Sequence, residues 1–151
     1  VGAVRNVPTS ETTWASLGCG AFLDGQRLQC SQTATVHESL IITGFPYDRT
    51  TTLDRQLKVF ERIIRDVHGV RRDGSAALDC CHVAAGRADA FWEFGLMPWD
   101  IGAGVLILRE AGARVTGFDD RDWTLPVKDI ATANPALHAQ LLATIREALG
   151  S

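Results

Sequence analysis

The chain has 151 residues, of which 46% are hydrophobic and 22% are charged, so it is long enough for one globular domain with its own core. A formal net charge of -3 excludes a uniform basic field, and we therefore expect neither nucleic acid nor an acidic membrane surface as a partner. A small neutral or anionic ligand is compatible with this composition. The apolar stretches are too short to cross a bilayer, so we expect no transmembrane helix.

Cysteine and histidine usage bears on the compartment and on metals. The four cysteines include no C-x-x-C pair and the N-terminus lacks the pattern of a secretory signal, which favours a reducing cytoplasm. Cys80 and Cys81 are adjacent and would point about 100° apart on a helix, so we expect buried packing rather than a bridge. No histidine stands at zinc spacing from another histidine or a cysteine, and a zinc site is not expected.

The first 31 residues consist of short β-favouring runs separated by turn residues. Asp24-Gly25 stands between two such runs and is a strong hairpin signal. We therefore predict an antiparallel meander for residues 1–31. The chain opens on a strand-like run without an initiator methionine, which hints at further sequence upstream.

Strand-like and helix-like segments alternate in the rest of the chain. An apolar run at residues 39–44 is typical of a sheet interior, and the next helix is marked by Thr51 with Asp54 three positions on, and extends to about Val67. Further strands are predicted at residues 69–72, 88–94, 114–116 and 129–133, and further helices at residues 75–85, 98–111 and 135–149, the last begun by Asn134-Pro135. This alternation predicts an α/β layered sheet, and no linker divides residues 1–151, which we interpret as one domain.

Several motifs stand in a recognisable order. They are Trp14-Ala15 followed by residues 18–25, the run at residues 43–47, the run at residues 74–104, and Glu110-Ala111-Gly112. Together they resemble the inositol monophosphatase family, in which a Trp-Asp pair, here Trp99-Asp100, begins a helix of small residues that ends in Glu-Ala-Gly. The resemblance implies an α/β fold, a layered α-β-α sandwich of the inositol monophosphatase/sugar phosphatase type, of which this chain would be the C-terminal half.

Asp100 is the first candidate site residue. It falls at a predicted helix start just after Pro98, where an acidic residue favours the helix dipole whether or not a metal is present. The following Gly102, Ala103 and Gly104 leave room for a hydrated ion. The resemblance implies that Asp100 is a ligand of a catalytic Mg2+, an ion that takes hard oxygen ligands.

Glu93 and the segment 74–76 are the candidate substrate-binding residues. Glu93 stands in an apolar run, where an unpaired charge is costly to bury, so it is either exposed at the strand end or faces a polar ligand. The resemblance favours the second reading and implies that Glu93 accepts hydrogen bonds from substrate hydroxyls. Gly74, Ser75 and Ala76 lie where a strand passes into a helix, a position whose free N–H groups suit oxygen-rich ligands but which a plain helix start would also use.

Other polar residues are interpreted without a site. Asp79 and His82 lie three residues apart on a predicted helix and are expected to satisfy each other or solvent rather than bind metal. Arg71 and Arg72 are interpreted as surface charge, although they could attract phosphate. Glu110 is interpreted as a helix-end carboxylate.

The resemblance implies a Mg2+-dependent phosphomonoesterase for inositol monophosphate or a related small polyol or sugar phosphate. Such hydrolysis needs clustered carboxylates for two or more cations, and the family supplies most of them from an N-terminal half whose motifs are not found here. We therefore expect a chain that is inactive alone and pairs with that half or forms a homo-oligomer. The alternatives are a non-catalytic binding or dimerisation module, or a phosphatase for fructose bisphosphate, histidinol phosphate or phosphoadenosine phosphate.

Overall fold

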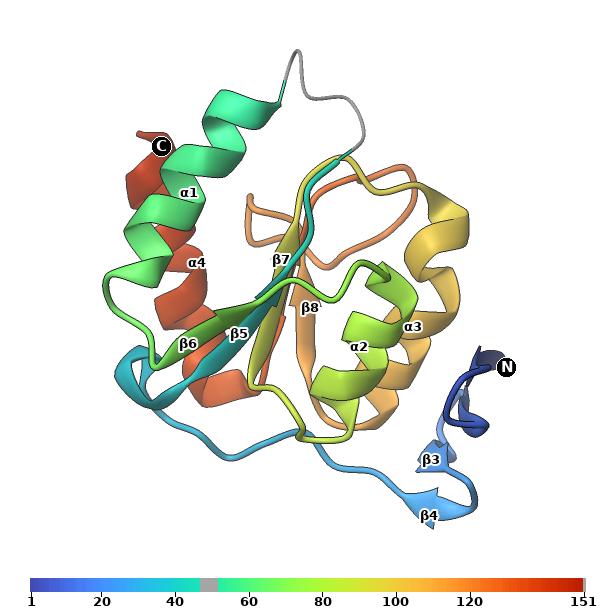
Figure 1. The fold of residues 1–151 in the computed structure, drawn as a ribbon. Coiled ribbons are helices and arrows are strands. Elements are labelled where there is room, and N and C mark those ends of the chain that lie inside the picture. Colours follow the sequence, from blue (N-terminus) through green and yellow to red (C-terminus); the bar gives the residue numbers. More distant parts are fainter. Residues whose placement is uncertain (47–51, 151) are drawn as a thin grey trace.

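The computed structural model describes residues 1–46 and 52–150, in which two β-sheets are layered with two pairs of helices (Figure 1). The first sheet is antiparallel and its strands follow one another in chain order. Its strands are β1 (Gly2–Asn6), β2 (Glu11–Ser16), β3 (Gly20–Leu23) and β4 (Gln26–Arg27). Asp24 and Gly25 join β3 to β4 with φ of 47° and 87°, the left-handed backbone that a two-residue hairpin needs. The predicted meander is confirmed.

The second sheet is mixed and holds five strands in the order β6-β5-β7-β9-β8. These strands are β5 (Leu40–Thr43), β6 (Gly69–Arg71), β7 (Ala90–Glu93), β8 (Arg114–Thr116) and β9 (Ile130–Ala133). β6, β5 and β7 are parallel, whereas β9 runs antiparallel to both β7 and β8. All four residues of β7 and of β9 are buried, as expected for strands covered on both faces. A short 3-10 helix, η1 (Val36–Glu38), precedes β5 and was not predicted.

Helices cover both faces of the five-stranded sheet. Helices α1 (Leu53–Ile64) and α4 (Pro135–Leu149) lie against each other on one face, and α2 (Ala76–Ala84) and α3 (Pro98–Glu110) lie against each other on the other (Figure 1). The antiparallel sheet packs on the outer side of α3 and so adds a further layer. The predicted α/β sandwich with an antiparallel N-terminal meander is therefore the observed fold.

Helix ends follow the sequence signals closely. The side chain of Asn134 accepts hydrogen bonds from the N–H groups of Ala136 and Leu137, and α4 begins at Pro135 as predicted. The predicted start of α1 at Thr51 lies outside the described residues. That helix ends at Ile64 rather than near Val67, because the backbone turns there and the Asp66 N–H bonds the Ile63 carbonyl.

Two apolar cores lie on the two faces of the five-stranded sheet, one beneath each helix pair. Cys80 and Cys81 are buried and unbridged in the core beneath α2 and α3, as predicted. A Cβ added at Gly104 of α3 would lie 2.6 Å from the Cβ of Cys80, so the close approach of α2 and α3 depends on that glycine. None of the described helices is long and apolar enough to span a membrane.

Candidate active site

A cavity of about 710 Å³ opens beyond the carboxyl ends of the parallel strands β6, β5 and β7. Ligands bind at this edge of α/β sheets, because strand ends and the helix starts that follow them converge there. The five candidate site residues, which come from three separate segments, all line this cavity: Gly74, Ser75, Ala76, Glu93 and Asp100. The residues predicted from the sequence therefore lie together at one cavity in the structure, while their roles in binding remain predictions.

Asp100 is the third residue of α3, and its carboxylate both caps the helix and lines the cavity. Its Oδ2 accepts a hydrogen bond of 2.8 Å from the N–H of Met97, which stabilises the start of the helix. The same carboxylate is half-buried and lines the cavity. Helix capping thus fixes the orientation of a carboxylate that faces the cavity.

Glu93 ends β7 and is 8% exposed. Burial raises the pKa of its carboxyl to about 7; the nearby Arg72 guanidinium opposes this shift and the Asp100 carboxylate adds to it. Gly44, just after the neighbouring strand β5, packs against this side chain. Only a glycine fits there, because a Cβ atom added at Gly44 would lie 2.2 Å from the Glu93 carboxyl group. Glu93 is therefore held inside the cavity wall rather than exposed at a strand end.

The segment 74–76 forms the turn from β6 into α2. Gly74 has a φ of +93°, which an L side chain rarely adopts, and the Ser75 side chain makes no capping hydrogen bond. The first turn of α2 therefore lines the cavity and has no side-chain cap on its amides, an arrangement that suits an anion. Two cationic side chains, Arg72 and Lys128, line the same cavity.

One interpretation from the sequence was incomplete and another was wrong. Arg71 and Arg72 are both exposed, as expected of surface charge, but Arg72 also lines the cavity near Glu93, while Arg71 donates a hydrogen bond to the Val70 carbonyl. Asp79 does not pair with His82. The Nδ1 of His82 lies 3.6 Å from the Oδ2 of Asp73, while Asp79 is buried and its oxygens have no hydrogen-bond partner among the described residues.

Asp79 also lines the cavity, where its environment disfavours the charged form. Burial raises the pKa of its carboxyl to about 8, the carboxylates of Asp73 and Glu93 add to the shift, and Arg72 opposes it. The sequence carried a signal for this residue, since an aspartate between apolar neighbours on a buried helix face needs a partner. Asp79 was missed because His82, three residues on, stood as a ready partner.

Glu110 is the last residue of α3, as predicted, and it has a further contact. Its carboxylate oxygens accept hydrogen bonds of 2.8 and 2.7 Å from the N–H groups of Gly18 and Gly20. These two bonds lower the pKa of Glu110. The end of α3 is thereby fixed to the turn between β2 and β3, far from the cavity.

Comparisons with known proteins show which family and which solved folds the chain resembles. A model described as the inositol monophosphatase family matches residues 1–150. The inositol-1-monophosphatase of Synechocystis sp. is 42% identical over 93% of this chain and 49% of its own length. The Nus factor SuhB of Pseudomonas aeruginosa is 42% identical over 87% of this chain and 49% of its own.

Among solved structures, the inositol monophosphatase from Anabaena (Nostoc) sp. superposes with a TM-score of 0.92 at 36% identity. That match covers 96% of this chain and 59% of the Anabaena chain. The present chain thus spans about half the length of the curated relatives it matches.

Proposed function

The chain belongs to the inositol monophosphatase family, and we propose that it forms the substrate-binding part of a Mg2+-dependent phosphomonoesterase. The proposed substrate is inositol monophosphate or a related small polyol or sugar phosphate. The relative from Synechocystis is named an inositol-1-monophosphatase, which supports this substrate class. We also propose a cytoplasmic location, since the chain's four cysteines are free thiols and three of them are buried.

One observation carries the proposal: a buried glutamate, a helix-start aspartate, two cations and a row of backbone amides surround one cavity. Asp100 has the hard oxygen donors that Mg2+ prefers, and we propose that it holds the ion. When bound, the ion would polarise the phosphate ester and lower the pKa of a water. Arg72, Lys128 and the amides of residues 74–76 would bind the phosphate oxygens.

Glu93 is proposed to select the alcohol part of the substrate. With a pKa of about 7, both forms of this carboxyl are populated near neutral pH. Its ionised form accepts hydrogen bonds from polyol hydroxyls, and binding of such donors favours that form. A substrate with vicinal hydroxyls therefore fits this wall of the cavity better than an apolar ester does.

We propose that the 151 residues are not sufficient for turnover. Three carboxylates line the described part of the cavity, Asp79, Glu93 and Asp100, and burial raises the pKa of the first two, which disfavours their charged forms. A centre with two or more cations requires further carboxylates. The proposed partner is a polypeptide equivalent to the N-terminal half of a relative, and association with a second copy of this chain is also compatible.

The test joins this chain to the N-terminal half of the Synechocystis relative and measures phosphate release from inositol monophosphate in the presence of Mg2+. We expect no release from the isolated chain and measurable release from the joined protein. Asp100→Asn keeps an oxygen that can cap α3 but should lower kcat by about 100-fold or more. Glu93→Gln should mainly raise KM, whereas Asp122→Asn, at an exposed aspartate outside the cavity, should change neither.

Two results would contradict the proposal. Ready Mg2+-dependent turnover by the isolated chain would show that the carboxylates described above are sufficient. Unchanged kcat in Asp100→Asn within an active joined protein would remove Asp100 from the metal site. Comparison of inositol monophosphate with fructose bisphosphate, histidinol phosphate and phosphoadenosine phosphate on the same protein would decide the substrate class.

A further inference from the structure

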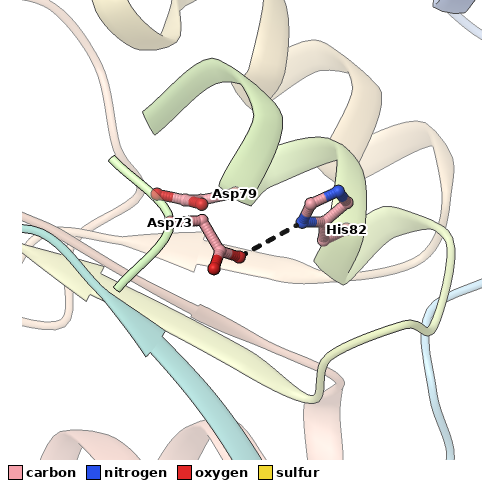
Figure 2. Close-up of side chains that lie close together, drawn as sticks. All are labelled: Asp73, Asp79 and His82. Carbon is pink, nitrogen blue, oxygen red and sulfur yellow. Dashed lines mark ion pairs between the residues drawn. The ribbon is translucent and has the colours of Figure 1, made fainter. Parts of the chain in front are cut away.

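Three potential metal ligands converge where the loop after β6 meets α2. Asp73 lies in the loop, and Asp79 and His82 project from successive turns of the helix (Figure 2). One carboxylate oxygen from each aspartate and one ring nitrogen of His82 all lie within 4.8 Å of one another. One carboxylate oxygen from the loop, and one carboxylate oxygen and one ring nitrogen from α2, thus lie close enough together to bind one ion.

Asp79 gives an independent reason to expect a ligand there. It is 1% exposed, and neither of its carboxylate oxygens has a hydrogen-bond partner among the described residues. A buried carboxylate without a partner is costly in either protonation state, because the neutral form also leaves polar atoms unbonded. A cation bound between Asp79 and its two neighbours would supply the missing partner.

We propose that Asp73, Asp79 and His82 form a binding site for a divalent first-row transition ion, for which Zn2+ is the probe. A mixed set of imidazole nitrogen and carboxylate oxygen suits such ions, whereas Mg2+ and Ca2+ prefer oxygen alone. Ligand bonds of about 2.0–2.2 Å place ligand atoms at most about 4.4 Å apart. The ligand atoms lie within 4.8 Å of one another, so the exposed Asp73 and the half-buried His82 would have to move only slightly toward Asp79 to bind one ion.

The sequence alone did not indicate this site, because Asp79 and His82 are only two ligands and were expected to satisfy each other or solvent rather than bind metal. The third ligand comes from the loop, and Gly74, with its left-handed backbone, turns that loop back over α2. The site is distinct from the proposed Mg2+ position at Asp100, which offers oxygen donors only. An ion held here would cross-link the loop to α2 on either side of Ser75, and so fix part of the cavity wall.

The test measures Zn2+ binding to the full chain by competition with a chromophoric chelator at pH 7.5, in a Cys19→Ser background that removes the exposed thiol. We expect one Zn2+ per chain and a rise in Tm when Zn2+ is added. His82→Gln and Asp73→Asn should each weaken binding by about tenfold or more. His68→Gln, at an exposed histidine outside the cluster, is the matched control and should bind as the parent does.

The readouts do not depend on phosphatase activity, so failure of this site and failure of the proposed function are distinguishable. Co2+ bound by the parent should give a visible absorption spectrum that changes in His82→Gln, because one nitrogen ligand is lost. Asp73 is exposed, so its asparagine variant is expected to fold, and circular dichroism verifies this. Absence of one-to-one Zn2+ binding, or equal affinity in the parent and in folded Asp73→Asn and His82→Gln, would overturn the proposal.

Discussion

Replacing Glu93 with glutamine should remove part of the pH dependence of folding. The pKa of the Glu93 carboxyl is raised from 4.5 to about 7, so the folded protein keeps a proton that the unfolded chain has already lost in that interval. The resulting stability is present below pH 4.5 and is lost as the pH rises through 7. At about 1.4 kcal/mol per pKa unit, this one group lowers the free energy of unfolding by about 3 kcal/mol across the window.

Urea unfolding of the parent and of Glu93→Gln at pH 4.5, 5.5, 6.5 and 7.5 measures this contribution. The difference between the two proteins should change by about 3 kcal/mol across the series, in the direction that makes the variant relatively more stable at high pH. Glu61→Gln, at an exposed glutamate in a surface ion pair, should show almost no such change. A parent-minus-variant difference that stays constant with pH would refute the claim that Glu93 is protonated by burial.

Packing and capping give two further predictions. Gly104→Ala would place a methyl group 2.6 Å from the Cβ of Cys80, so it should lower the free energy of unfolding by about 1–3 kcal/mol in thermal unfolding. Gly102→Ala on the same helix is the control: its methyl group would meet nothing within 4 Å, so it should be neutral or slightly stabilising. Equal effects at the two positions would contradict the contact between α2 and α3. Glu110→Gln should speed hydrogen exchange at the amides of Gly18 and Gly20, which donate hydrogen bonds to the Glu110 carboxylate. Amides of the five-stranded sheet should keep their protection from exchange. Unchanged exchange at the two glycines would contradict these hydrogen bonds.

The fold was largely readable from the sequence because local and global signals agree in most segments. Asp24-Gly25 specified a hairpin by backbone conformation alone, and Asn134-Pro135 specified a helix start by capping. The end of α1 was less predictable, because Val67 continues the apolar spacing of the helix beyond Ile64, although the backbone turns toward β6 before it. The strand order of the five-stranded sheet depends on contacts between distant segments, which periodicity does not report.

The residues predicted for the candidate site line one cavity, but the electrostatics of that cavity were missed. Glu93 was a candidate because a charge in an apolar run needs a partner, whereas an acidic residue at a helix start is ordinary and the family resemblance gave Asp100 its predicted role. Arg72 and Asp79 were missed because their surroundings are made by the turn at Gly74, which brings the end of β6 over α2. Sequence spacing shows which side chains share a helix face, but a loop residue joins that set only in three dimensions.

Helix α3 is capped by Asp100 at its start and is bonded to the meander through Glu110 at its end. Its 13 residues span about 20 Å. Asp100 lies in its first turn, beside the cavity. At the far end, the Glu110 carboxylate accepts hydrogen bonds from the turn between β2 and β3. The helix therefore links the meander to the carboxylate for which a role in metal binding is proposed above. A shift of the meander along the axis of α3 would also move Asp100. Residues of the meander that do not contact a substrate can thus influence the position of this carboxylate.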